Sequence, residues 1–230
     1  MQQRGVAQVW RDWRGFVLFV AVMLVFRSAI ADWNQVPSGS MKPSILVGDR
    51  IVVDKLAYDL RIPFTLTRIA RWSEPGRGDV VTFPSPVDET LYVKRVIGLP
   101  GDVVELRRNR LIINGKAARY TALTEAQIDA LDVEAKDRYA FYYEEIGPMR
   151  HVVMLRHDRA ESAYQSFAPT VVPQGQYLML GDNRDDSGDF RQIGWVGRER
   201  ILGRAHAIAF SLDYEHHYAP RLRRFFEGLT

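Results

Sequence analysis

The sequence predicts a mostly-β protein with one apolar helix at its N-terminus and a smaller inserted α+β segment. Three observations predict this class. Residues 15–26 form one uncharged, almost wholly apolar run. Short runs rich in β-branched and aromatic residues recur after it, separated by turn-forming residues. Residues 107–172 differ from both in being richer in charge and in helix-forming residues, which marks them as an insertion.

The composition is that of a folded protein and excludes several kinds of chemistry. Of the 230 residues, 47% are hydrophobic and 26% are charged. The chain has no cysteine, which excludes thiol catalysis, disulfides and cysteine-ligated metals. The net charge of +3 is small and the basic residues are dispersed, so we expect no nucleic-acid partner. Only five of the 31 basic residues are lysines, so few side chains could serve as a neutral amine.

Residues 15–31 are predicted to be a transmembrane anchor. A spanning helix needs about 20 apolar residues, and a shorter run is also typical of a buried core helix, which is the alternative. Aromatic and basic residues typical of membrane interfaces flank the run: Trp10, Trp13 and Trp33, with Arg4, Arg11 and Arg14 before it and Arg27 at its end. The positive-inside rule then places residues 1–14 in the cytoplasm. We therefore expect a single-pass protein of the inner membrane whose folded part lies on the periplasmic side.

The rest of the chain divides by its secondary-structure pattern. Strands are predicted at residues 49–54, 79–83, 91–97, 103–106, 110–113, 151–156, 176–180 and 203–210. One further helix is predicted at residues 125–139, where Thr124 and Gln127 have the spacing of a capping box. The expected parts are the cytoplasmic residues 1–14, the anchor 15–31, the β core 32–106, the insertion 107–172, the second part of the core 173–212 and a tail 213–230. We expect the arginine-rich tail to be a solvated end, with contact to anionic lipid as the alternative.

Residues 36–43 (VPSGSMKP) predict a stiff bend that can present a hydroxyl group. The prolines restrict the backbone, and Gly39 allows another part of the chain to approach closely. Such a bend leaves backbone N–H groups free to bind an oxyanion. A plain linker is the alternative, because clusters of Pro, Ser and Gly are usually loops.

Lys94 lies in a predicted strand among apolar residues. Alternation places it on one face with Tyr92 and Val96. A free lysine, with a pKa of about 10.4, is neutral in fewer than about one molecule in a thousand at pH 7, but burial lowers that pKa. Lys94 is therefore a candidate general base; the alternative is an edge lysine whose amine reaches water.

Residues 180–191 (LGDNRDDSGDFR) combine acids, an amide and arginines directly after an apolar strand. They predict either a solvated turn or a hydrogen-bonded platform. A calcium loop fails, because an EF-hand starting at Asp182 would place Ser187 where glycine is needed and Ile193 where glutamate is needed.

Other common hydrolase patterns are missing from the sequence. There is no G-x-S-x-G motif, and no S-x-x-K motif surrounds Ser40. The five histidines form no recognisable motif, so we expect no metal site and no cofactor.

Taken in order, PSGSM, YVKRVIGLPGD and GDNRDDSGDFR resemble the motifs of bacterial type I signal peptidases, which use a serine–lysine dyad. The resemblance implies a membrane-bound serine endopeptidase that removes signal peptides from exported preproteins after A-x-A sites, with preproteins and the lipid membrane as partners. It implies that Ser40 is the nucleophile, Lys94 the general base and Ser38, with the Ser40 N–H, the oxyanion hole. It implies a supporting role for Ser187, which would orient Lys94, and for Asp182, Asp189 and Arg191. The implied substrate-pocket residues are Val36, Pro37, Met41, Ile45, Tyr92 and Val93.

The chain departs from the family in three respects, and several alternatives stay open. It has one apolar run where many relatives have two, no disulfide, and Asp186 where the family often has asparagine. Lys42 is a rival base, because positions 40 and 42 of an extended segment face the same way. Alternative functions are a specialised peptidase that matures a pilin or conjugation factor, a self-cleaving regulator, and a tethered binding domain without activity.

Overall fold

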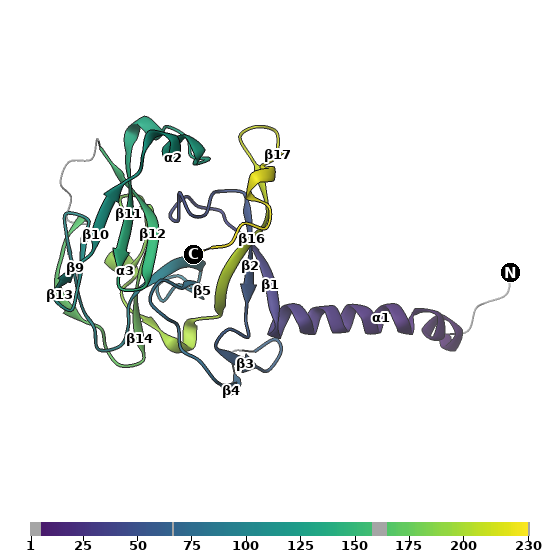
Figure 1. Cartoon of the computed structure of the whole chain (residues 1–230). Coiled ribbons are helices and arrows are strands. Elements are labelled where there is room, and N and C mark those ends of the chain that lie inside the picture. Colours follow the sequence, from purple (N-terminus) through teal and green to yellow (C-terminus); the bar gives the residue numbers. More distant parts are fainter. Residues whose placement is uncertain (1–5, 66, 158–164, 230) are drawn as a thin grey trace.

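The protein is mostly β, as predicted, and its helices are few (Figure 1). The computed structural model describes residues 6–65, 67–157 and 165–229. Helix α1 (Val6–Ala29) projects away from the β body, with the N-terminal end farthest from it (Figure 1). In the described part of the chain, no helix has both the length and the apolar character needed to cross a membrane.

The main sheet joins strands from both ends of the chain, and all of its pairings are antiparallel. Its order is β1-β2-β16-β5-β6-β14-β15, and β17 pairs with β16. The strands are β1 (Ala31–Gln35), β2 (Asp49–Asp54), β5 (Val80–Pro84), β6 (Leu91–Gly98), β14 (Gln176–Leu180), β15 (Val196–Gly197), β16 (Gly203–Asp213) and β17 (Ala219–Pro220). Because β14 pairs with β6, the strand before the acidic loop lies beside the strand that carries Lys94.

Two smaller sheets and a hairpin complete the β structure. The four-stranded sheet has the order β13-β7-β8-β9, the three-stranded sheet has the order β10-β11-β12, and β3 pairs with β4. These strands are β3 (Asp59–Arg61), β4 (Arg68–Arg71), β7 (Val103–Arg107), β8 (Arg110–Ile113), β9 (Lys116–Ala117), β10 (Arg119–Ala122), β11 (Tyr139–Ile146), β12 (Met149–Arg156) and β13 (Phe167–Val171). The short helices are α2 (Glu125–Ala130), α3 (Phe190–Ile193) and the 3-10 turns η1 (Lys136–Arg138), η3 (Arg198–Arg200) and η4 (Leu222–Arg224).

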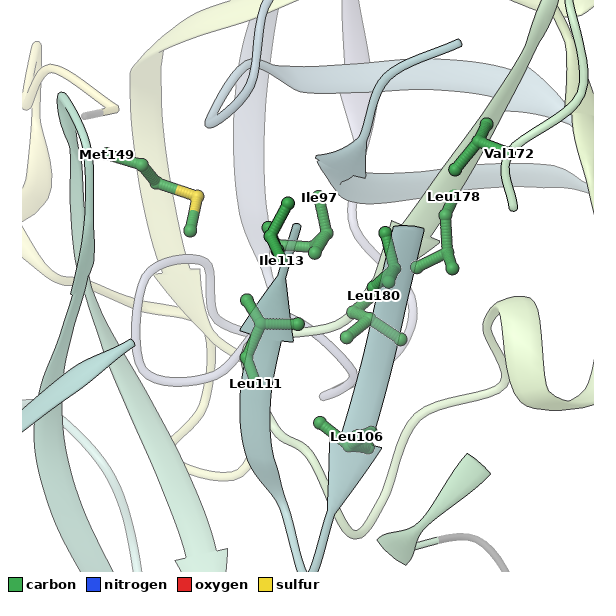
Figure 2. Packing of buried hydrophobic residues seen from close by; sticks show 9 residues of the cluster. Ile97, Leu106, Leu111, Ile113, Met149, Val172, Leu178 and Leu180 are labelled. Carbon is green, nitrogen blue, oxygen red and sulfur yellow. The ribbon is translucent and has the colours of Figure 1, made fainter. Parts of the chain in front are cut away.

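A hydrophobic core holds the main sheet against the four-stranded sheet (Figure 2). Its buried residues are Ile97, Val104, Leu106, Leu111, Ile113, Met149, Val172, Leu178 and Leu180. Gly98 allows the close approach, because a Cβ there would lie 2.9 Å from side-chain atoms of Leu178, Val104 and Val172. This packing fixes the C-terminal half of β6 and so the position of Lys94 on the same strand.

The predicted helix at residues 125–139 is wrong over most of its length. The capping box of Thr124 and Gln127 is confirmed, but α2 ends at Ala130 and β11 begins at Tyr139. Leu131 is extended, and Val133 is buried in one cluster with Leu123 and Phe141. The chain leaves the helix because burial of Val133 outweighs local helix propensity.

The structure does not test the predicted division into parts. Strand β7 crosses the predicted boundary between residues 106 and 107, and it pairs with β8 and β13, which belong to the predicted insertion. Because this sheet joins strands from both sides of the boundary, the division into parts stays a prediction.

Candidate active site

Ser40 lies in the turn between β1 and β2 and is held by the loop that follows β14. The backbone N–H of Asn183 donates to the Ser40 carbonyl at 3.1 Å, and Asn183 Nδ2 donates to the Gly39 carbonyl at 3.1 Å. The side chain of Ser40 faces Lys94, whose Nζ lies 2.6 Å from Ser40 Oγ. The fold thus brings together a hydroxyl and an amine that lie 54 positions apart in the sequence, an arrangement that can serve as nucleophile and base.

Lys94 is buried, with 3% of its surface exposed. Burial is the main reason that the pKa of Lys94 falls from 10.5 to about 8; the negative charges of Asp189 and Asp182 act in the opposite direction, and Arg191 lowers the pKa further. Its Nζ also donates to the Val93 carbonyl at 3.1 Å. With this pKa, about one lysine in ten is neutral at pH 7, which makes Lys94 a usable base.

The backbone around Ser40 leaves a donor free for an oxyanion. Among the described residues, the Ser40 N–H has no acceptor. The Gly39 carbonyl belongs to the same planar peptide unit and points the opposite way, so its hydrogen bond from Asn183 also sets the direction of the Ser40 N–H. Ser38 Oγ lies 3.4 Å from Ser40 Oγ and is close enough to supply a second donor.

A cleft of about 610 Å³ opens beside the pair. Five of the six predicted pocket residues line it: Val36, Pro37, Met41, Tyr92 and Val93. Ile45 does not line the cleft; it is fully buried in one cluster with Val36 and Met41. The cleft wall is therefore apolar next to the hydroxyl and the amine.

Two buried ion pairs hold the loop that follows β14. Arg95 binds Asp182 through two hydrogen bonds of 2.9 and 2.8 Å, and Ser44 Oγ donates to the same carboxylate at 2.6 Å. Asp189 caps α3 and accepts from Arg191 at 2.7 and 2.6 Å and from the Gly181 N–H at 3.0 Å. These contacts tie the loop to β6 and to the turn after Ser40.

Ser187 lies close to Ser40 but does not make the expected contact. A Cβ at Gly181 would lie 2.2 Å from Ser187 Oγ and 2.5 Å from the Ser40 carbonyl oxygen, so all three groups are neighbours. Ser187 Oγ is buried and has no hydrogen-bond partner within the described residues, and thus no bond to Lys94. Its orienting role stays a prediction.

The rival base, Lys42, lines the cleft but is not paired with Ser40. Its stem lies against Gly39, where a Cβ would be 3.2 Å from Lys42 Cε. Its amine makes no hydrogen bond to any described residue, whereas the amine of Lys94 contacts Ser40 Oγ. The geometry thus favours Lys94 as the base.

Sequence reasoning missed three residues that shape the site. Asn183 orients the turn at Ser40, Ser44 binds Asp182, and Arg95 neutralises Asp182. Arg95 and Asn183 lie in the motifs quoted above, but only contacts between distant segments reveal what they do. In the described ranges, no three His, Cys, Asp or Glu side chains are grouped so that they could hold a metal ion.

A serine hydroxyl beside a buried lysine amine in an apolar cleft is an arrangement typical of serine peptidases. Residues 10–210 match the family model described as signal peptidase, peptidase S26. Because the match covers most of the chain, the chain belongs to this family and is a serine endopeptidase of the signal-peptidase class. The resemblance and the enzyme class predicted from the three motifs are thus confirmed.

Two relatives with the same family name agree with the family match. Signal peptidase I of Pseudomonas aeruginosa is 33% identical over 210 residues, covering 86% of this chain and 71% of the relative. Signal peptidase I of Rickettsia conorii is 36% identical over 220 residues, covering 87% and 79%. A crystal structure of a signal peptidase I from Enterococcus faecalis is 28% identical, covers 57% of this chain and 97% of that chain, and has a TM-score of 0.35.

Proposed function

We propose that this chain removes N-terminal signal peptides from exported preproteins at the membrane, with Ser40 as nucleophile and Lys94 as general base. The observation that carries the proposal is the contact of 2.6 Å between Lys94 Nζ and Ser40 Oγ. Burial that lowers the pKa of Lys94 to about 8 supports the same assignment. A neutral amine at that distance can take the proton as the hydroxyl attacks.

The proposed reaction has two steps. Lys94 accepts the Ser40 proton while Oγ attacks the scissile carbonyl, and the oxyanion accepts hydrogen bonds from the Ser40 N–H and the Ser38 hydroxyl. The protonated Lys94 then gives its proton to the leaving amine. In the second step, Lys94 takes a proton from water, which attacks the acyl group on Ser40. Lys94 then returns that proton to Ser40 Oγ as the acyl–oxygen bond breaks, which releases the second product and restores the free enzyme.

Other residues are proposed to support the pair without performing the chemistry. Asp182 and Asp189, each held by an arginine, keep the loop after β14 in place. Ser187 lies beside the Ser40 carbonyl, and its hydroxyl has no partner among the described residues. We propose that a rotation about its side-chain bond brings it to Lys94 and that this rotation accompanies substrate binding.

The cleft offers an extended peptide a strand edge to pair with and an apolar wall for its side chains. Strand β14 pairs with β6 only from Arg95 onward, so on the side away from β5 no described strand pairs with Leu91, Tyr92 and Val93. A preprotein can therefore add as a strand beside them. Val36, Pro37, Met41, Tyr92 and Val93, backed by Ile45, form an apolar wall. We propose that this wall accepts the small apolar side chains of A-x-A sites.

We further propose that α1 attaches the protein to the inner membrane, with the cleft on the periplasmic side. Its apolar residues from Phe16 to Phe26 are largely exposed, and no other part of the described chain covers them (Figure 1). Trp13 and Trp33 flank this segment, as interfacial aromatics do. Attachment would raise the effective concentration of preproteins that emerge from the same surface.

Cleavage of a purified secretory precursor by the detergent-solubilised protein tests the proposal. Wild type should cleave after an A-x-A site, and Ser40→Ala should not, although its circular dichroism is unchanged. Cleavage by Ser40→Ala would refute the assignment of the nucleophile. If wild type cleaved only pilin-type precursors, the specialised peptidase would replace the general one.

A further inference from the structure

Lys42 is a charged residue of the cleft that the proposed reaction does not use. Residues 34–42 line the cleft without interruption, and Lys42 is the last of them. Its side chain is partly buried, and its amine forms no hydrogen bond and no ion pair with any described residue. A lysine carries a positive charge at neutral pH. The cleft is therefore lined by a cation for which the described part of the chain supplies no partner.

The turn at Ser40 holds the stem of Lys42. The Lys42 N–H donates to the Gly39 carbonyl at 3.1 Å, and the Asn183 side chain donates to the same carbonyl at 3.1 Å. A Cβ at Gly39 would lie 3.2 Å from Lys42 Cε and 3.3 Å from Lys42 Cδ, so the stem packs across Gly39. Because this packing keeps the amine close to the Ser40 turn, less side-chain entropy is lost when the amine binds a ligand there.

The other charged side chains that line the cleft already have partners. Lys94 is paired with the nucleophile at 2.6 Å. Asp186 lies 3.6 Å from Arg156 and accepts a hydrogen bond from Tyr139 at 3.4 Å. Among the described residues of the cleft, Lys42 is thus the one that offers an unpaired charge to a substrate. The side chain that complements this charge is a carboxylate.

Acidic side chains on the far side of Lys42 are the alternative partners. Glu134, Glu215 and Asp132 line a small hollow of about 90 Å³ together with Lys42. Asp132 is bound by Arg221 at 3.1 Å. The two glutamates are exposed, and neither forms an ion pair with Lys42. Because water screens exposed charges, these acids leave Lys42 available to a closer carboxylate.

The order of residues along the cleft assigns the position of that carboxylate. Val36 and Pro37 belong to the apolar wall proposed for the A-x-A side chains. Ser40 attacks the bond, and Lys42 lies two positions farther along. A peptide that follows this wall therefore reaches Lys42 after the cleaved bond. Alternate side chains of an extended peptide face the same way, so the second residue after the bond faces the wall together with the two alanines of A-x-A.

We propose that Lys42 determines specificity by binding an aspartate or glutamate side chain at the second residue after the cleaved bond. This inference rests on the function proposed above. Since Lys42 lies away from the reacting atoms, the ion pair forms when the preprotein binds and persists in the transition state. It should therefore raise kcat/KM by lowering KM.

Precursors that differ only at this second residue test the proposal. The residue is glutamate, glutamine or lysine; the first two have nearly the same shape and differ in charge. The full-length, detergent-solubilised protein is compared as wild type, Lys42→Met and Lys42→Glu. Lys116→Met is the matched control, because it removes the same charge from an exposed position on β9 outside the cleft. Melting temperatures verify the fold of each variant.

We expect wild type and Lys116→Met to cleave the glutamate precursor up to about fivefold more efficiently than the glutamine precursor, as befits a partly exposed ion pair, and added salt should weaken this preference. Lys42→Met should lose the preference, and Lys42→Glu should prefer the lysine precursor. Equal cleavage of the glutamate and glutamine precursors by wild type would overturn the inference but leave the proposed function standing.

Two further outcomes would also decide the matter. A preference that persists in Lys42→Met, with a lowered melting temperature, would assign Lys42 to the acids of the small hollow and overturn the inference. Failure of wild type to cleave any of the three precursors would overturn the proposed function, and the inference with it.

Discussion

Two hollows share the turn after Ser40 as a wall, and they differ in the basic side chains that line them. The larger, of about 900 Å³, lies between the inserted segment and the C-terminal tail, behind Pro43 and Ser44. The smaller, of about 610 Å³, lies in front of Ser40. The larger one is lined by His151, whose pKa burial lowers to about 4, and by arginines, whose guanidinium does not lose its proton in a protein. The smaller one contains a lysine whose burial prepares it to do so.

The arginines of the larger hollow are mostly engaged in ion pairs. Arg224 binds Asp49 at 2.7 Å, and Arg221 lies 3.1 Å from Asp132. In the cleft, by contrast, the amine of Lys94 meets a hydroxyl rather than a carboxylate. The comparison teaches that volume does not identify the site: a desolvated amine next to a nucleophile does.

The largest expected effect is the difference in turnover between variants of the two lysines that line the cleft, Lys94 and Lys42. We expect Lys94→Met to abolish measurable turnover, because removal of a catalytic base in such a unit costs on the order of 10⁴-fold or more. Lys42→Met should keep kcat/KM within a few-fold of wild type. The measurement is precursor cleavage by both variants, with melting temperatures as the control for folding. Equal loss in both variants would refute the choice of Lys94.

Ser38→Ala should have the next largest effect. Loss of one oxyanion donor costs about 2–4 kcal/mol of transition-state stabilisation, and the Ser40 N–H remains. Because the contact forms in the transition state, kcat should fall while KM is nearly unchanged. Steady-state kinetics would show whether kcat or KM changes. A raised KM with an unchanged kcat would assign Ser38 to substrate binding instead.

The pH dependence of kcat/KM tests whether Lys94 must be neutral for turnover. The proposed reaction needs neutral Lys94, and burial lowers the pKa of Lys94 to about 8. Well below this value, kcat/KM should fall about tenfold for each pH unit. From pH 8, where half of the lysine is neutral, to pH 6 it should fall about fiftyfold, and it should level off above pH 8. Initial rates in overlapping buffers would give the profile. A flat profile between pH 6 and pH 8 would contradict a lysine base.

Asn183→Ala should have a smaller effect, because the Asn183 side chain acts through the peptide unit between Gly39 and Ser40. The variant loses the bond to the Gly39 carbonyl but keeps the backbone bond to the Ser40 carbonyl. One such hydrogen bond is worth about 0.5–1.5 kcal/mol, so we expect kcat to fall by up to about tenfold with little change in KM. A lower melting temperature with unchanged kcat would mean that Asn183 supports only the fold.

The sequence predicts the strands and the reactive pair better than it predicts the contacts between them. Alternation and turn residues are local, and the predicted strands at 49–54, 110–113 and 176–180 match β2, β8 and β14 residue for residue. The helix at 125–139 fails because burial of Val133, a tertiary effect, overrides a local pattern. The role of Asn183 depends on a contact across 144 positions, which no local pattern contains.

The smallest expected effect is that of a substitution in the larger hollow. Arg223 lines that hollow and forms no ion pair with any described residue, so Arg223→Ala removes a charge without breaking such a pair. We expect turnover to stay near that of wild type and the free energy of unfolding to change by less than about 0.5 kcal/mol. Precursor cleavage and denaturant unfolding would measure both. A large loss of turnover with an intact fold would mean that the larger hollow takes part in the reaction, through the wall that it shares with the Ser40 turn.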